Sequence, residues 1–139
     1  MKFLRYSVIL SAIGLILTAV AGCAKAPVID IHHVTALEAK ALIDRNAGNP
    51  AFVILDLRTP GEFAQGHIEG AVMLDFHSPE FVQGLQRLDR SKTYLLYCRT
   101  GNRSGSTLKM IEKMGFNTIY HLKPGIVEWR ARNLPLTKS

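Results

Sequence analysis

The sequence predicts an α/β domain, with a central parallel sheet and helices on both of its faces. Segments with strand character alternate with segments of helix character. The two clearest strands, at 52–57 and 93–97, are apolar runs of the kind that is buried on both faces of a sheet. The 139 residues are 47% hydrophobic and 20% charged, which excludes a disordered chain and a multi-span membrane protein. The length suits one domain.

Short apolar runs and turn residues divide the chain into elements. The expected order is strand 28–33, helix 35–46, strand 52–57, helix 59–66, strand 71–74, a helix opening at 78–79, strand 93–97, helix 104–114, strand 117–122 and helix 125–132.

The first two helices carry start signals. Thr35 with Glu38 and Thr59 with Glu62 have the Thr-x-x-Glu spacing of a capping box, in which hydroxyl and carboxylate satisfy the first free N–H groups of a helix. Pro60 suits the first turn because its missing N–H has no partner there. These signals fix two of the expected helices.

The later helices are expected from their apolar spacing. Val82, Leu85 and Leu88 stand three residues apart, which predicts that all three face the core. Trp129 is expected to pack into the core from the last helix. No repeat or second domain is indicated.

The first residues have the pattern of an export signal. Lys2 and Arg5 precede the uncharged segment 6–22, which is predominantly apolar. The run VAGC at residues 20–23 resembles the bacterial lipobox, which implies cleavage before Cys23 and acylation of that residue. Ala24, where lipoproteins retained at the inner membrane have Asp, implies the periplasmic face of the outer membrane if the host is Gram-negative. An uncleaved membrane anchor and an ordinary signal with a buried Cys23 are the alternatives.

We therefore expect three segments: a lipoprotein signal peptide at 1–22, a lipidated N-terminus and short linker at 23–27, and the folded domain at 28–139. The two cysteines are too few for a disulfide scaffold. With Cys23 lipidated, Cys98 is left as a lone thiol in an oxidising compartment, either buried and inert or kept for its reactivity.

The charges are unevenly distributed. Residues 23–89 hold five basic and nine acidic side chains, whereas residues 90–139 hold ten basic and two acidic ones. This asymmetry predicts a positive field that attracts small anions to the second half. The basic residues form no stripe interleaved with aromatic residues, so no nucleic-acid partner is expected. The histidines have no metal-ligand spacing, so we assign no metal.

Two reactive groups follow predicted strands. Asp56 lies at the end of strand 52–57, and Cys98 comes directly after strand 93–97. Ligands of open parallel sheets bind beyond the carboxyl edge, so one cleft is expected to hold both side chains.

The segment CRTGNRS at 98–104 connects this strand to a helix. Its backbone N–H groups and the helix N-terminus can converge on the sulfur of Cys98. Arg99 and Arg103 add positive charge, which favours the thiolate and lowers the pKa of the thiol. Gly101 allows a turn with positive φ. A buried, inert cysteine is the alternative, but two arginines and a glycine around a thiol serve no evident folding purpose. The chain has no Walker A motif.

These residues resemble the rhodanese (thiosulfate sulfurtransferase) family. Two motifs carry the resemblance: ILDLRTPGEFAQGHIEGAV at 54–72 and YCRTGNRSG at 97–105. A weaker likeness follows in YHLKPGIVEWRARNLPL at 120–136, where Pro124 replaces the first residue of a Gly-Gly pair. The resemblance spans residues 28–136 and implies a three-layer domain in which Cys98 forms a persulfide.

The resemblance also implies roles for the neighbouring residues. Asp56 and Arg58 would brace the active-site loop, with a carboxylate acid/base role for Asp56 as the alternative. Arg99 and Arg103 would receive the sulfonate of the donor. The loop that surrounds the sulfur and the substrate would consist of Arg99, Thr100, Gly101, Asn102, Arg103 and Ser104.

The implied reaction moves a sulfane sulfur from thiosulfate or a similar donor to cyanide or a thiol, for which a thioredoxin-like protein is one candidate. No cofactor is implied. Cysteine phosphatases and arsenate reductases have five residues between the cysteine and the arginine, whereas Cys98 and Arg103 have four, and the tighter ring suits one sulfur atom. A rhodanese-like module that binds a partner or senses redox state without turnover is the other alternative.

Overall fold

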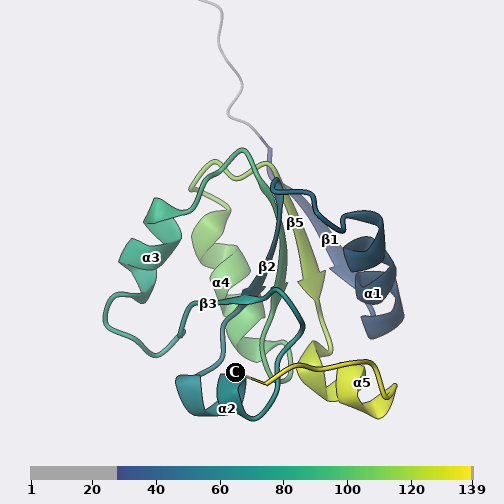
Figure 1. Ribbon diagram of the computed structural model, residues 1–139. Coiled ribbons are helices and arrows are strands. Elements are labelled where there is room, and N and C mark those ends of the chain that lie inside the picture. Colours follow the sequence, from purple (N-terminus) through teal and green to yellow (C-terminus); the bar gives the residue numbers. More distant parts are fainter. Residues whose placement is uncertain (1–27, 139) are drawn as a thin grey trace, which may run out of the picture.

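In the computed structural model, which describes residues 28–138, five parallel strands form one sheet with the strand order β1-β5-β4-β2-β3 (Figure 1). The α/β class predicted from the sequence is confirmed. The elements in chain order are β1 (Asp30–Val34), α1 (Ala36–Arg45), β2 (Phe52–Asp56), α2 (Pro60–Ala64), β3 (Val72–Met73), α3 (Phe81–Arg87), β4 (Thr93–Tyr97), α4 (Asn102–Ile111), β5 (Thr118–Leu122) and α5 (Gly125–Ala131).

The predicted signal peptide, Cys23 and the linker at 23–27 lie outside the described residues. Within residues 28–138, none of the helices combines the length and the apolar character that crossing a bilayer requires.

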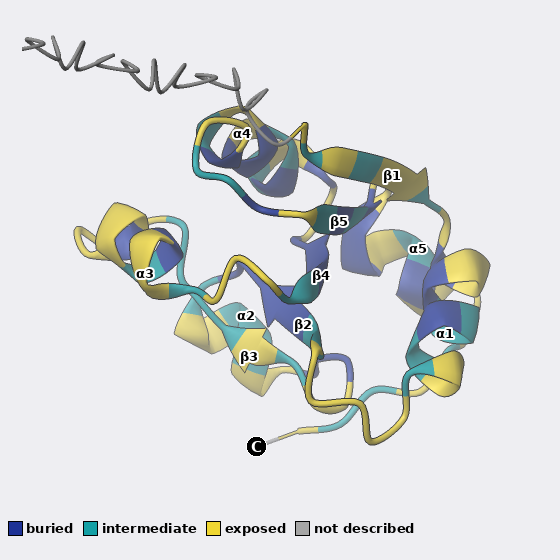
Figure 2. Ribbon diagram, turned by 90° about the horizontal axis from the view of Figure 1, so that it is seen from above, coloured by how far each residue is buried: buried dark blue, intermediate teal, exposed yellow. Residues whose placement is uncertain are grey.

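Helices lie on both faces of the sheet, as Figure 2 shows from above: α3 and α4 on one side, α1 and α5 on the other. Each face has its own core. The first includes Leu96, Phe81 and Leu108, and the second includes Leu95, Ala39 and Trp129. Neighbouring residues of β4 therefore serve opposite cores, which is why its sequence is apolar without alternation.

The strand register brings the two predicted reactive groups to one edge. Asp56 pairs with Tyr97 at the end of β2 and β4, so Cys98 begins the loop directly beyond this pair. On the other side of β4, Leu96 pairs with His121 of β5. The shared carboxyl edge predicted for Asp56 and Cys98 is confirmed, but both side chains are buried, at 0% and 1% exposed, so they do not share an open cleft.

The start signals of the first two helices are confirmed as well. Both Thr35 and Thr59 accept from the backbone N–H three residues later, and both glutamates of the capping boxes accept from the backbone of their threonine. The buried Trp129 is also confirmed.

Two helix predictions need correction. Helix α3 begins at Phe81 rather than at 78–79, and Val82 is 42% exposed. Leu85 faces the core as predicted, but its partner there is Phe81 rather than Val82, because residues four apart lie on the same side of a helix. Helix α4 begins at Asn102, two residues earlier than expected, because Gly101 takes a left-handed conformation with φ 89° and ends the loop there.

Candidate active site

The sulfur of Cys98 is buried at the end of β4 but faces hydrogen-bond donors. The side chain is 1% exposed. The N–H of Gly101 donates to Sγ over 3.1 Å, and Oγ of Ser104 lies 3.4 Å from Sγ. Gly101 is the N-cap of α4, and Ser104 lies in the first turn of this helix. The loop therefore curls its donors around the sulfur, as the sequence predicted.

These donors change the ionisation of the thiol. Burial by itself raises the pKa of Cys98, but hydrogen bonds from Ser104 and from the backbone of Thr100 and Gly101 lower it further than burial raises it. The net pKa of the thiol lies below its ordinary value. Cys98 is thus set up as a nucleophile, because the thiolate is the reactive form.

Helix α5 holds the loop in this conformation. The N–H of Ile126 donates to the carbonyl of Cys98 over 2.9 Å, and the N–H of Val127 donates to the carbonyl of Arg99 over 3.2 Å. These bonds engage loop carbonyls on the outside, which leaves loop N–H groups free to face the sulfur.

The close approach of the two backbones requires glycine. A Cβ at Gly101 would lie 1.9 Å from the carbonyl oxygen of Lys123, and one at Gly125 would lie 2.3 Å from that of Arg99. Both glycines have positive φ. Pro124 adopts φ −77° and ψ −7° before Gly125, so the turn accommodates a proline where the family usually has its first glycine.

Asp56 and Arg58 form a buried ion pair at the end of β2. Asp56 is 0% exposed and Arg58 2%. The guanidinium donates to the carboxylate at 2.6–3.0 Å and also to the backbone carbonyls of Glu62 and Gly66. These contacts tie the end of strand β2 to the segment around α2.

Arg103 differs from the expectation that it receives the donor. Its two terminal nitrogens donate to the two carboxylate oxygens of Glu62, each over 2.7 Å. Glu62 simultaneously caps α2 by accepting from Thr59. The guanidinium thus fastens α4 to α2, and its positive charge remains close enough to attract the thiolate of Cys98.

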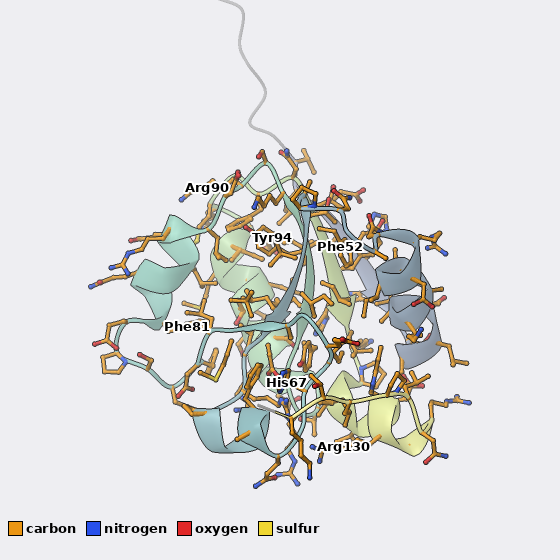
Figure 3. The ribbon with its side chains drawn as sticks, in the orientation of Figure 1. Phe52, His67, Phe81, Arg90, Tyr94 and Arg130 are labelled. Atoms are coloured by element: carbon orange, nitrogen blue, oxygen red, sulfur yellow. The ribbon has the colours of Figure 1, made fainter. Side chains whose placement is uncertain are left out.

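The remaining loop residues differ in exposure. Arg99, Thr100 and Asn102 are exposed, whereas Ser104 is fully buried. Arg99 lines a cavity of about 390 Å³ next to α5, together with Arg58, Glu62 and Arg130. Figure 3 shows Arg130 at the end of the molecule where α2 and α5 lie. Arg58 is paired with Asp56 and Glu62 with Arg103, so Arg99 and Arg130 give this cavity its positive balance, which suits an anion.

The sequence did not predict two site residues. Arg130 is on α5, and only the fold brings it to the cavity. His121 is 3% exposed, and its Nε2 lies 2.8 Å from Oγ of Ser104. The adjacency of β4 and β5 was the missing information, because His121 reaches the site only through that pairing.

The described part of the chain, residues 28–138, contains no group of three or more metal-binding side chains. The site is thus built from one thiol, its ring of donors and a positively charged cavity.

A family model for the rhodanese-like domain matches residues 35–132. The chain belongs to the rhodanese-like family. The matched range includes the loop 98–104, whose geometry is described above.

Curated relatives of this rhodanese-like chain include proteins named sulfurtransferases. It is 28% identical over 103 residues to a sulfurtransferase of Allochromatium vinosum, covering 74% of this chain and 94% of that protein. It is 38% identical over 87 residues to the thiosulfate sulfurtransferase GlpE of Stutzerimonas stutzeri, covering 62% and 74%. A match of 37% over 82 residues to the probable adenylyltransferase/sulfurtransferase MoeZ of Mycobacterium tuberculosis covers 59% of this chain but only 21% of that longer protein.

Solved structures show the same fold. A rhodanese-related protein from Thermoplasma volcanium aligns with a TM-score of 0.63 and 25% identity, covering 78% of this chain and 99% of that one. The solution structure of a rhodanese-like domain from Anabaena aligns with a TM-score of 0.64 and 25% identity, covering 77% and 79%.

Proposed function

We propose that this rhodanese-like protein is a sulfurtransferase that carries a sulfane sulfur on Cys98. The observation that supports this most directly is the N–H of Gly101, which donates to Sγ of Cys98 over 3.1 Å within a loop that lowers the pKa of the thiol. A ring of donors that stabilises a thiolate also stabilises the anion of a persulfide.

The reaction proceeds by two displacements. The thiolate of Cys98 attacks the outer sulfur of thiosulfate or a similar donor, a new S–S bond forms, and the old S–S bond breaks with its electron pair leaving on sulfite. Cyanide or a thiolate then attacks the terminal sulfur of the persulfide, which restores the Cys98 thiolate. A thioredoxin-like protein is one candidate for the thiol acceptor.

The donor's anionic group is assigned to Arg99 and Arg130, which line the cavity next to α5. Arg103 is not assigned to the donor, because Glu62 occupies both of its terminal nitrogens. Its role is to place positive charge near the sulfur and to hold the loop.

The phosphatase alternative is disfavoured by the same contacts. Four residues separate Cys98 from Arg103, one fewer than in cysteine phosphatases and arsenate reductases. In addition, the arginine that would bind a phosphate is paired with Glu62. The loop is therefore one residue shorter than a phosphate-binding loop of those enzymes, and its arginine is engaged by a carboxylate.

The test is to incubate the full chain with thiosulfate and analyse the Cys98 peptide by mass spectrometry. We expect one added sulfur atom in the wild type, removed by cyanide as thiocyanate, and none in C98S. No adduct in the wild type would contradict the sulfurtransferase activity and support a binding module without turnover. Hydrolysis of a phosphate monoester at a comparable rate would instead support the phosphatase.

We also propose that the protein works in the bacterial envelope, anchored through acylated Cys23. The lipobox-like run at 20–23 after an apolar segment supports this. Metabolic labelling with palmitate should mark the wild type but not C23A, and equal labelling of both would contradict the anchor.

A further inference from the structure

A chain of polar side chains leads from the sulfur of Cys98 to the opposite surface of the active-site loop. Oγ of Ser104 lies 3.4 Å from Sγ of Cys98 and 2.8 Å from Nε2 of His121. On the other side of the imidazole ring, Nδ1 of His121 lies 3.0 Å from Nδ1 of His33. Cys98, Ser104 and His121 are buried, and His33 is exposed.

The outer end of the chain opens to solvent away from the donor cavity. A second cavity, of about 420 Å³, is lined by His33, His121, Lys123 and part of α4. It shares no lining residue with the cavity that holds Arg99 and Arg130. A proton that leaves here does not cross the path of the sulfur donor.

The single hydroxyl proton of Ser104 limits how this chain can be arranged. Sγ of Cys98, Nε2 of His121 and the carbonyl of Gly101 all lie within hydrogen-bond distance of Oγ. Ser104 can donate to one of them at a time. The tautomer of His121 therefore decides whether the serine can donate to the sulfur, since Nε2 either takes the serine proton or supplies one to Oγ.

Two proton arrangements satisfy the chain. With a neutral thiol, Cys98 donates to Ser104, Ser104 donates to Nε2 of His121, and Nδ1 of His121 donates to Nδ1 of His33. With a thiolate, every bond is reversed: His33 donates to His121, Nε2 of His121 donates to Ser104, and Ser104 donates to the sulfur. Conversion moves three protons by one step each, and the heavy atoms stay in place.

We infer that Ser104, His121 and His33 form a proton relay that carries the thiol proton of Cys98 to the exposed imidazole of His33. The net change is a thiolate at Cys98 and an extra proton on His33, which His33 releases to water from its other ring nitrogen. His121 and His33 are positioning residues in this scheme, because they act on the sulfur through Ser104. The inference rests on the proposed function only in that the thiolate is the form that attacks the donor.

The surroundings of His121 keep its ring able to pass protons. Burial, and after it the repulsion from His33, lower its pKa to about 4. The charged or titratable groups that face it are His33 from β1, Lys123 beyond β5, and Lys109 and Glu112 from α4. The ring is therefore neutral near pH 7, with one N–H and one free nitrogen, which is the state a relay requires.

The first test measures the pH dependence of Cys98 alkylation by iodoacetamide in the full chain. Removing the ring in H121F should raise the pKa of the thiol and slow alkylation near pH 6 about tenfold, with the same plateau at high pH. H33A should slow it about threefold. H32A is the matched control, because His32 is the neighbouring exposed histidine but bonds Asp30 and stacks on Tyr120.

H121Q separates loss of the hydrogen bond from loss of the ring, and it covers the case in which H121F does not fold. Its amide can donate to Ser104 or accept from it, so the thiolate stays stabilised and the pH profile should lie closer to that of the wild type than the profile of H121F does. A wild-type profile in H121F would overturn the role of His121, and the tautomer measurement tests the relay itself.

The second test reads the tautomer by ¹⁵N NMR of the histidine rings. Above the pKa of Cys98, the wild type should carry the ring proton of His121 on Nε2, whereas C98S should carry it on Nδ1. The same tautomer in both proteins would overturn the inference. Neither measurement uses a sulfur donor, so a failed relay and a failed sulfurtransferase activity are distinguishable.

Discussion

Glu62 binds Arg103 through two parallel hydrogen bonds of 2.7 Å, although the two residues are 41 positions apart in the chain. The same carboxylate accepts from the backbone and the hydroxyl of Thr59 at the start of α2. One side chain therefore completes a helix cap and fastens that helix to the active-site loop. The bidentate geometry makes this pair stronger than an ordinary surface ion pair.

This contact predicts a specific pH dependence of stability. The Arg103 hydrogen bonds lower the pKa of Glu62 from 4.5 to about 2. Because the folded-state pKa is the lower one, the stabilisation is complete above the unfolded value and is lost as the pH falls from about 4.5 to 2. E62Q should cost about 1–2 kcal/mol at pH 7, allowing for solvent screening of a partly exposed pair.

Urea denaturation of wild type and E62Q at a series of pH values measures the effect. The difference between them should shrink below pH 4.5 and approach zero near pH 2. E69Q serves as the control, because Glu69 is exposed and carries no ion pair in residues 28–138. A pH-independent difference between wild type and E62Q would show that the carboxylate acts only as a cap.

The glycine that ends the active-site loop gives a second prediction. In G101A the new methyl group would lie 1.9 Å from a backbone carbonyl, at a φ of 89° that side chains rarely adopt. The backbone of Lys123 must move away, so we expect a loss of about 3 kcal/mol or more and loss of sulfur loading on Cys98.

The matched control is G105A, in the first turns of α4. Nothing lies within 4 Å of a Cβ at this position. Replacing a helical glycine by alanine should stabilise the protein by about 0.5–1 kcal/mol. Thermal unfolding of both variants should thus shift in opposite directions, and a G101A as stable as the wild type would contradict the close packing of the two loops.

Local patterns in the sequence were sufficient to predict most of the fold. The apolar runs at 52–57 and 93–97 predicted the central strands, since a strand that is buried on both faces is apolar at nearly every position and is easily recognised in the sequence. The capping boxes predicted two helices, because the cap chemistry is complete within four residues. The prediction that Val82 faces the core was wrong because Val82 and Phe81 are neighbours with the same apolar character, and only packing distinguishes them.

The active-site loop could also be predicted, because its residues are consecutive and their backbone groups meet by local turn geometry. The contacts made between distant segments could not. Arg103 was expected to face the donor and pairs with Glu62 instead, and His121 had no assigned role. Both depend on strand order and helix placement, which no local pattern encodes.

The buried pair of Asp56 and Arg58 gives a third prediction. Both side chains are nearly inaccessible to solvent, and the guanidinium has its hydrogen bonds completed by two backbone carbonyls. D56N leaves this charge buried without its counter-charge, which should cost about 3–5 kcal/mol. Chemical denaturation measures the loss.

The surface pair of Lys40 and Asp44 is the comparison for that variant. It is an exposed i,i+4 pair on α1 with a distance of 2.7 Å. K40A should cost only about 0.3–0.5 kcal/mol, although the distance is nearly the same as in the buried pair. Equal losses in D56N and K40A would contradict the view that burial makes Asp56 and Arg58 structurally important.

The last prediction concerns the cavity next to α5. Arg130 lines it, whereas Arg132, two residues further on, is exposed and pairs with Glu128 instead. If Arg130 binds the anionic donor equally well in the ground state and in the transition state, R130A should raise KM for thiosulfate several-fold and leave kcat nearly unchanged. The effect should weaken in high salt, because mobile ions screen the same attraction. R132A removes the same charge at a position outside the cavity, so it should leave KM near the wild-type value. A fall in kcat at unchanged KM in R130A would instead place this guanidinium on the departing sulfite, since only an interaction gained in the transition state acts on kcat alone.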